Sequence, residues 1–295
     1  MLGLSIDNDL IHAAIVKDGG AAVSSANAAT PDDSYRACLQ TIADLVVRHV
    51  GNDRIKGSVG VAIPAVVREH CLTNSAVPYL NGKNLQQDLQ AALGCPIRLY
   101  SYGTCFTYYE AVHGAGIGAN SLFGMHIDTH CTGGLVVNGV CMDGNNGIAG
   151  NWAHLPLPAP VPYETDGQIC WCGRTGCMES FVSAASLERD YVNITGNHLG
   201  IDAIAVAAQD SDIVAENVLQ VLEDRLGRAT AAIITLLDPD VIIIGGRIGQ
   251  MERLIRNVPR KWPGYVTVKR PRTQLCPAKT GAHAAAAGAA MLASG

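Results

Sequence analysis

The sequence predicts an α/β protein that consists of two related lobes with a cleft between them. The chain has 295 residues, of which 48% are hydrophobic and 16% are charged, so it can bury a large core and is not disordered. Strand-like and helix-like segments alternate along it, and a pair of strands opens each half, at 2–16 and at 121–138. This repeated order indicates an internal duplication.

The first half is expected to contain four strands and three helices, assigned from apolar runs and from apolar residues at helical spacing. The expected strands are 2–6, 10–16, 58–63 and 97–100, and the expected helices are 32–49, 85–93 and 106–113. Asp7-Asn8-Asp9 is expected to form the tight turn between the first two strands. The glycine-rich segment 114–120 follows, so we expect an N-terminal lobe of 1–116, completed by a C-terminal helix at 281–295.

The second lobe is expected to span 117–280. Its expected strands are 121–127, 133–138 and 241–244, and its expected helices are 183–192 and 213–237. Asn138-Gly139 is typical of a tight hairpin turn, because both residue types tolerate positive φ.

The composition excludes several classes of function. The formal net charge is −5, which argues against binding to a nucleic-acid backbone. No apolar run approaches the roughly 18 residues of a membrane span, and the start MLGLSIDNDL carries no basic leader, so we expect a cytoplasmic protein. Without a leader, the ten cysteines are not expected to form a disulfide framework.

Three of the cysteines cluster in the segment 170–177, which reads CWCGRTGC. Its glycines let the backbone fold back, so that Cys170, Cys172 and Cys177 can face one ion, and thiolates suit zinc, which prefers four ligands. His154, sixteen residues before Cys170, is the natural fourth ligand. A closed set of three cysteines and one histidine is typical of a structural zinc site, so we expect zinc to hold this loop.

Several segments resemble the ROK family of sugar kinases and repressors. GQICWCGRTGCMES at 167–180 resembles the family's zinc signature, and IAGNWAHLPLP at 148–158 resembles the segment with its zinc-binding histidine. LLDPDVIIIGGRI at 236–248 resembles its late helix–strand–glycine segment near the nucleotide. VGVAIPAVV at 59–67 and YLNG at 79–82 are most similar to the bacterial fructokinase (manno-fructokinase) branch.

The resemblance implies a two-lobed actin-like ATPase fold, related to ribonuclease H, in a homodimer that phosphorylates a hexose with ATP and Mg²⁺. It implies a sugar site that includes His154 and Glu179; the alternative is that Glu179 caps the helix after it. It also implies nucleotide binding near Gly133-Gly134 and Gly245-Gly246. Family repressors carry an additional N-terminal helix-turn-helix, whereas this chain begins at its first strand, so we expect no DNA-binding role.

The catalytic position departs from the family pattern. A sugar kinase uses a carboxylate to accept the proton of the attacking hydroxyl, and the resemblance places it in an Asn-Asp pair at the end of a strand. Ser101 and Tyr102 stand at these two places, and a phenol with a pKa of about 10 is a poor base near neutral pH. We expect no nearby replacement, since Glu110 lies two helical turns further on.

Both segments that resemble phosphate loops are altered too. The family's Asp-x-Gly-Gly-Thr corresponds to SIDND at 5–9, and its Gly-Thr-Gly-x-Gly corresponds to DTHCT at 128–132. Asp7, Asp9 and Asp128 are therefore expected to repel the phosphates of ATP. Three places that contact the sugar in the family are changed as well. They hold Ala65, Ala76 and Asn151.

We therefore predict a pseudokinase with a sugar-binding, regulatory or scaffold role. Two alternatives stay open. One is an active kinase of the fructokinase or mannokinase type with a displaced base. The other is a hydrolase that uses Asp7, Asp9 or Asp128 with a divalent metal ion.

Overall fold

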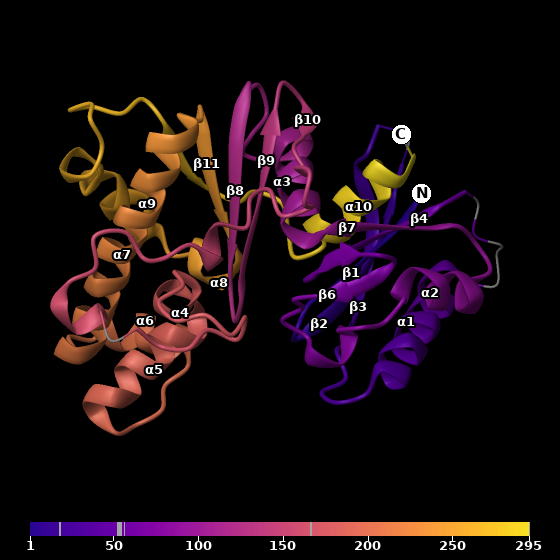
Figure 1. The fold of residues 1–295 in the computed structure, drawn as a ribbon, viewed down its shortest axis with the longest axis horizontal. Coiled ribbons are helices and arrows are strands. Elements are labelled where there is room, and N and C mark those ends of the chain that lie inside the picture. The colour runs from indigo at the N-terminus through magenta and orange to yellow at the C-terminus, as the bar shows by residue number, and fades with distance from the viewer. Residues whose placement is uncertain (18, 52–54, 56, 166, 295) are drawn as a thin grey trace. The chain divides into compact units, whose positions relative to one another are not determined.

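The computed structural model describes residues 1–17, 19–51, 55, 57–165 and 167–294. The chain forms two compact units, whose elements are labelled in Figure 1. Unit 1 comprises Met1–Asn120, Gly133–Gly150 and Lys279–Gly295, and unit 2 comprises Ser121–Thr132 and Asn151–Ala278. The lobe boundaries expected from the sequence stay a prediction.

Unit 1 contains a five-stranded sheet. Its strands are β1 (Leu2–Ile6), β2 (Leu10–Val16), β3 (Ala22–Ala29), β4 (Val59–Ile63) and β7 (Ile97–Ser101). Their order is β3-β2-β1-β4-β7, with β1 antiparallel to β2 and parallel to β4. The strand β3 was not predicted from the sequence, because this edge strand is mostly exposed and consists of small and polar residues without an apolar run.

Four helices accompany this sheet in unit 1. They are α1 (Tyr35–Val50), α2 (Leu85–Leu93), α3 (Tyr102–His113) and α10 (Ala284–Ser294). A small antiparallel pair, β5 (Val66–Arg68) and β6 (Cys71–Thr73), and the 3₁₀ turn η1 (Pro78–Leu80) lie between β4 and α2 in the chain. Helix α3 begins four residues earlier than predicted, because the Ser101 hydroxyl caps it by accepting the Thr104 N–H at 3.1 Å.

Both faces of the first sheet are covered, since successive side chains of a strand point to opposite faces. Leu2, Leu4 and Ile6 of β1 join a buried apolar core together with residues of α1 and α2. Between them, Gly3 lets α10 approach the backbone closely, because a Cβ atom there would collide with the carbonyl oxygen of Ala286. The alanine-rich sequence of α10 suits this close packing.

The second sheet repeats the topology of the first. Its strands are β8 (Ser121–Ile127), β9 (Cys131–Val137), β10 (Val140–Cys141), β11 (Val241–Gly245) and β12 (Gln274–Pro277). Their order in the sheet is β10-β9-β8-β11-β12. If the strands of each sheet are numbered by their order in the chain, both sheets have the order third, second, first, fourth, fifth. The predicted duplication is therefore confirmed. Asn138 and Gly139 form the turn before β10 with φ of 51° and 75°, as predicted.

Unit 2 contains six helices among the described residues, and the longest is α7. They are α4 (Glu179–Val182), α5 (Ala184–Thr195), α6 (Ile201–Gln209), α7 (Ile213–Leu237), α8 (Gly246–Gly249) and α9 (Glu252–Asn257). Four 3₁₀ turns complete the unit: η2 (Trp152–His154), η3 (Pro162–Glu164), η4 (Val258–Arg260) and η5 (Trp262–Gly264). Helices α4, α5 and α6 contact α7, which has the predicted bounds. No helix in the described ranges has both the length and the apolar character needed to cross a membrane.

Candidate functional site

Four side chains of unit 2 that can bind a metal ion converge on one point, as the sequence predicts. The sulfur atoms of Cys170, Cys172 and Cys177 and a ring nitrogen of His154 all lie within 4.8 Å of one another. The local backbone explains this convergence, since Gly173 adopts a φ of 86° and its N–H donates to the Cys170 carbonyl at 2.8 Å. The three cysteines and the histidine thus form a cluster that can hold a metal ion.

The spacing of this cluster fits a tetrahedral zinc ion. With zinc–sulfur bonds of about 2.3 Å and a zinc–nitrogen bond of about 2.0–2.1 Å, tetrahedral ligands lie about 3.8 Å (S···S) and about 3.6 Å (S···N) apart. The Cys172 and Cys177 sulfurs are 3.7 Å apart, and the Cys170 sulfur lies 3.6 Å from Nδ1 of His154. Nδ1 therefore faces the sulfurs, and Nε2 of the same ring is directed away from them.

Two of these four groups favour the protonation state that a metal binds, and two oppose it. Burial lowers the pKa of His154, which favours the neutral imidazole that a metal binds. Burial raises the pKa of Cys170 to about 12 and also raises that of Cys177. Burial opposes ionisation of Cys172 too, but the Arg174 backbone N–H and the neighbouring thiols lower its pKa overall. A bound cation is what would deprotonate all three thiols.

Trp171, in the middle of the cysteine cluster, connects it to a buried carboxylate. Its indole ring lies edge-on to His154, with ring centroids 4.7 Å apart, and edge-on to His130 at 5.7 Å. Its Nε1–H donates to Oε1 of Glu179 at 2.8 Å. Nδ1 of His130 lies 2.7 Å from the same oxygen. A continuous group of contacting side chains therefore leads from the cysteine cluster to Glu179. It consists of His154, which belongs to the cluster, Trp171, His130 and Glu179.

Glu179 has one oxygen left for a ligand. Its side chain is 4% exposed, and Oε1 is engaged by Trp171 and His130, whereas Oε2 is buried without a hydrogen-bond partner among the described residues. Glu179 also lies in the first turn of α4, where the alternative placed it, although it makes no side-chain cap hydrogen bond there, so both roles of Glu179 stay predictions. A buried, unpartnered carboxylate oxygen is an acceptor for a hydroxyl group.

Asp128 makes an ion pair that was not predicted from the sequence. Nε of Arg247 donates to its Oδ1 at 2.6 Å, and the Arg247 backbone N–H donates to Oδ2 at 3.0 Å. Burial alone would raise the pKa of Asp128, but the hydrogen bonds and charge of Arg247 lower it overall. The negative charge expected to repel a phosphate is therefore compensated within unit 2. The parallel pairing of Gly245 with His126 brings the two residues together, since Arg247 and Asp128 each lie two positions after one member of this pair.

The two segments that resemble phosphate loops use their own backbone N–H groups. In unit 1, the Asn8 N–H donates to Oδ1 of Asp7 at 2.7 Å, and the Asp7 N–H donates to the Leu10 carbonyl, which closes the predicted tight turn. In unit 2, the Thr129 N–H donates to Oδ1 of Asp128 at 2.9 Å. Donors that a phosphate would need thus already bind aspartate carboxylates.

A carboxylate lies near the position of Tyr102, contrary to the sequence expectation. Tyr102 is the buried first residue of α3, and Thr104 in the same turn donates through Oγ1 to Oδ1 of Asp143 at 3.4 Å. Asp143 follows β10 in unit 1 and is exposed. Sequence reasoning missed it because 39 residues separate the two partners. Glu110 is instead fully buried and accepts the backbone N–H groups of Ala115 and Thr280.

The glycine pairs expected near a nucleotide have packing roles. A Cβ atom on Gly134 would approach the Gly103 carbonyl oxygen to 2.5 Å, so glycine lets β9 lie against the start of α3 in unit 1. A Cβ atom on Gly246, whose φ is 76°, would collide with the Ile127 carbonyl in unit 2. These contacts require glycine whether or not a nucleotide binds.

Comparison with known proteins identifies relatives along the whole chain. The model of the ROK family matches residues 1–295. The N-acetylgalactosamine kinase AgaK of Shewanella sp. (strain ANA-3) is 30% identical over 261 residues, which cover 88% of this chain and 85% of that protein. The N-acetyl-D-glucosamine kinase of Vibrio cholerae serotype O1 is 29% identical over 277 residues, which cover 92% and 91% of the two chains.

Solved structures of the same fold include kinases and a regulator. A ROK family glucokinase from Streptomyces griseus, solved with glucose and AMPPNP, aligns with a TM-score of 0.87 at 23% identity and covers 99% of this chain and 98% of that chain. A ROK family transcriptional regulator, a homologue of the E. coli MLC protein, aligns with a TM-score of 0.81 at 22% identity and covers 100% and 77%. The two-sheet α/β fold is thus that of the ROK sugar kinases, an actin-like ATPase fold, and the chain belongs to the ROK family.

Proposed function

We propose that this protein is a sugar-binding member of the ROK family in which phosphoryl transfer has been lost. Its ligand is a hexose or an N-acetylhexosamine, bound in unit 2 by Glu179 and His154. The role that follows is that of a pseudokinase that senses a sugar or regulates a partner.

Sugar binding is supported by the polar group around Glu179. Oε2 of Glu179 is a buried acceptor without a partner among the described residues, and His154 directs Nε2 away from the cysteines. A sugar hydroxyl can donate a hydrogen bond to Oε2 of Glu179, and another hydroxyl can hydrogen-bond with Nε2 of His154. Several relatives are named as kinases of N-acetylated hexosamines, which favours that substrate class.

The loss of phosphoryl transfer rests on one observation above all. The N–H groups of Asn8 and Thr129 donate to the carboxylates of Asp7 and Asp128, within the segments that resemble the family's phosphate loops. A phosphate would have to displace both carboxylates and approach the negative charge of Asp7, whereas the charge of Asp128 is compensated by Arg247. The phenol of Tyr102 at the place of the family's catalytic base supports the same conclusion.

A structural zinc ion completes the proposal. His154, Cys170, Cys172 and Cys177 would hold it in a closed tetrahedral set without an open position for catalysis. Its role would be to fix the loop that carries Trp171. Trp171 in turn orients Glu179 through the 2.8 Å hydrogen bond.

Calorimetry with the full chain tests this proposal. We expect N-acetylglucosamine, N-acetylgalactosamine, glucose, mannose or fructose to bind without ATP, and ATP with Mg²⁺ not to bind in the micromolar range. Glu179→Gln should abolish sugar binding, whereas the matched exchange Glu252→Gln in α9 should not change it. Binding of ATP, with turnover of any of these sugars at an ordinary kinase rate of roughly 1–100 s⁻¹, would refute the pseudokinase.

A second candidate function is an active ATP-dependent hexose kinase with a displaced base. Asp143 favours it, because this carboxylate lies 3.4 Å from the Thr104 hydroxyl, two residues from the place of the missing base. The Asp128–Arg247 ion pair also favours it, since it removes one of the three expected repulsive charges. If the wild-type protein does turn over a sugar, Asp143→Asn should lower kcat by about 10²–10⁴-fold.

Four further hypotheses come from the sequence, and each has its own test. The protein would be a cytoplasmic homodimer, a state that sedimentation can measure. If the protein belongs to the fructokinase branch, it should bind fructose more tightly than N-acetylhexosamines. Nucleotide contacts at Gly133-Gly134 and Gly245-Gly246 would matter only for the kinase alternative. The metal-dependent hydrolase would require activity that Asp7→Asn, Asp9→Asn or Asp128→Asn removes.

A further inference from the structure

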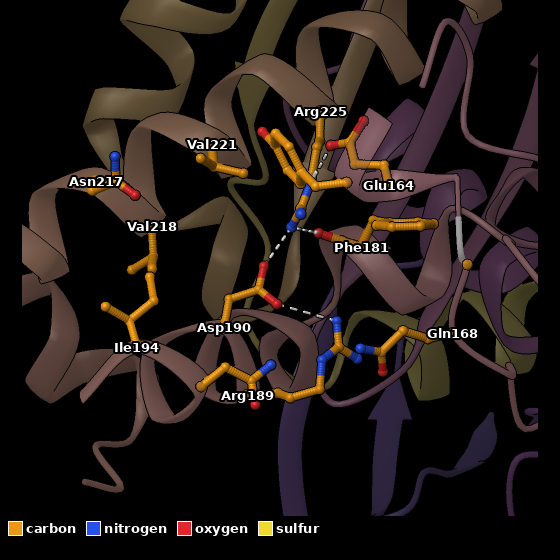
Figure 2. Close-up of a pocket in the computed structure, with 13 residues that line it drawn as sticks. Glu164, Gln168, Phe181, Arg189, Asp190, Ile194, Asn217, Val218, Val221 and Arg225 are labelled. Atoms are coloured by element: carbon orange, nitrogen blue, oxygen red, sulfur yellow. Dashed lines mark hydrogen bonds and ion pairs between the residues drawn. The ribbon is translucent and has the colours of Figure 1, made fainter. Parts of the chain in front are cut away.

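Unit 2 contains a pocket whose lining does not include Glu179 or the cysteine cluster. Its volume is about 610 Å³, which is within the range of sites for small molecules. Residues of α5 and α7 line it, together with Phe181 of α4 and the segment around Gln168, as Figure 2 shows. Neither Glu179, His154 nor any of the three clustered cysteines is among its lining residues.

The floor of this pocket is a network of paired charges. Arg225, which is 6% exposed, donates to Glu164 at 2.9 Å, to Asp190 at 2.5 Å and to the Phe181 carbonyl at 3.1 Å. Glu164 is fully engaged as well, because Arg228 donates to both of its oxygens. This network stabilises the walls, and its charges are neutralised among themselves.

Arg189 is different, because part of its guanidinium remains unused. Nη2 donates to the Ser180 carbonyl at 2.7 Å and lies 3.3 Å from Oδ1 of Asp190. Nε is buried and has no hydrogen-bond partner among the described residues, although the side chain as a whole is 30% exposed. A buried N–H without an acceptor is costly, and a guanidinium binds carboxylate and phosphate oxygens especially well. Nε itself is too buried to reach a ligand, but the exposed part of the guanidinium lines the pocket and can bind an anionic group there in addition to its ion pair with Asp190.

The remaining lining groups suit a polyol. The side-chain amides of Gln168, Asn193 and Asn217 can each donate to and accept from hydroxyl groups. Ile194 and Val218 offer an apolar surface for the C–H face of a ring, and in Figure 2 they lie on the side opposite Arg189 and Gln168.

From these groups we infer a second binding site for a polyhydroxylated anion of about monosaccharide size. Arg189 binds the anionic group, the amides bind the hydroxyls, and the apolar residues contact the ring or chain. A sugar phosphate and a sugar acid share this chemistry. The site depends on residues of unit 2 that take no part in the proposed sugar site.

Isothermal titration of the full chain with glucose 6-phosphate and with gluconate tests the inference. We expect at least one of them to bind tenfold or more tightly than glucose and than inorganic phosphate. Arg189→Gln should weaken that binding tenfold or more. Asn217→Ala, which shortens an exposed side chain of α7, should weaken it severalfold without altering the fold. The preferred probe distinguishes a phosphate ester from a carboxylate.

Two control variants show whether the anion binds in this pocket. Arg48→Gln changes an exposed arginine on α1 and should leave binding unchanged. Glu179→Gln should also leave it unchanged, although the same variant should abolish binding of a neutral sugar at the proposed sugar site. The inference is overturned if neither anion binds better than glucose, or if Arg189→Gln and Asn217→Ala bind like the wild type. It is equally overturned if Arg48→Gln or Glu179→Gln removes the binding.

Discussion

Trp171 donates its indole N–H to Oε1 of Glu179 at 2.8 Å, and this contact joins the loop of clustered cysteines to the carboxylate of the proposed sugar site. The indole ring also lies edge-on to His154, which belongs to the cysteine cluster. The conformation of the loop between Cys170 and Cys177 thus decides where the Glu179 carboxylate is held. A metal ion without a catalytic role would still affect ligand binding through this residue.

Removing the indole N–H should therefore weaken sugar binding without unfolding the protein. In Trp171→Phe, Glu179 loses a hydrogen bond to a charged acceptor, which is worth about 1.5–3 kcal/mol. We expect roughly tenfold or greater loss of sugar affinity by calorimetry, with little change in the melting temperature. Trp262→Phe removes a similar indole hydrogen bond, to Thr230 at 2.8 Å, far along the chain and should leave sugar affinity unchanged. Equal affinities for both variants would contradict the role of Trp171.

The cysteine cluster should contain one zinc ion per chain. Cys172→Ser should lose the metal and lower the free energy of unfolding by several kcal/mol, since a structural metal contributes directly to folding. Cys71→Ser, which changes a half-buried cysteine of β6, should keep the metal and nearly all of the stability. Elemental analysis and denaturant unfolding measure the two effects. Protein purified without chelator that contains no zinc would exclude this site.

The Asp128–Arg247 ion pair should make stability depend on pH in the acid range. Because Arg247 lowers the pKa of Asp128 below its ordinary value of 3.8, the stabilisation is present above that value. It disappears as the pH falls through the lower pKa of the folded state. Arg247→Gln should cost about 1 kcal/mol or less at pH 6, because the pair is partly exposed, and the difference should vanish toward pH 2. Urea unfolding of both proteins across this range measures it, and a difference that grows on acidification would contradict the assignment.

ATP should not bind in the micromolar range, because the N–H groups of Asn8 and Thr129 are occupied by aspartate carboxylates. Replacing the altered loop positions by glycine, in a variant with Asp7, Asn8, Asp128, His130 and Thr132 all changed, should permit measurable nucleotide binding. A fluorescent ATP analogue reports this directly. If the wild type binds ATP tightly, a cation or a rearranged loop must neutralise these carboxylates.

Restoring a carboxylate at the position of Tyr102 should not by itself restore catalysis. General base catalysis contributes about 10²–10⁴-fold, but the phosphates would still lack the donors that position them. We expect Tyr102→Asp to phosphorylate no hexose above background in a coupled assay. Combined with the glycine substitutions it should give measurable turnover. Activity of the single variant would mean that the phosphate loops bind ATP despite their aspartates.

Much of the architecture was predictable because it depends on local pattern. Apolar runs and helical spacing predicted β1, β2, β8 and β11, and α2 and α7 had the expected bounds. The strand β3 escaped prediction, because an exposed edge strand of small residues carries little hydrophobic signal. The start of α3 was placed four residues late, because the cap at Ser101 matters more there than apolar spacing.

The sequence by itself determined the cysteine cluster, since three cysteines within eight residues have little freedom to lie apart and His154 precedes them closely. It also indicated the duplication, because a pair of strands opens each half, although the full order of strands in the two sheets came from the structure. Only the tertiary structure decided which charges meet. Arg247 reaches Asp128 because β11 and β8 pair in parallel register, and His130 reaches Glu179, 49 residues later in the chain, because its loop folds onto α4. Such contacts depend on register and loop packing between segments far apart in the chain, and no local sequence pattern specifies either.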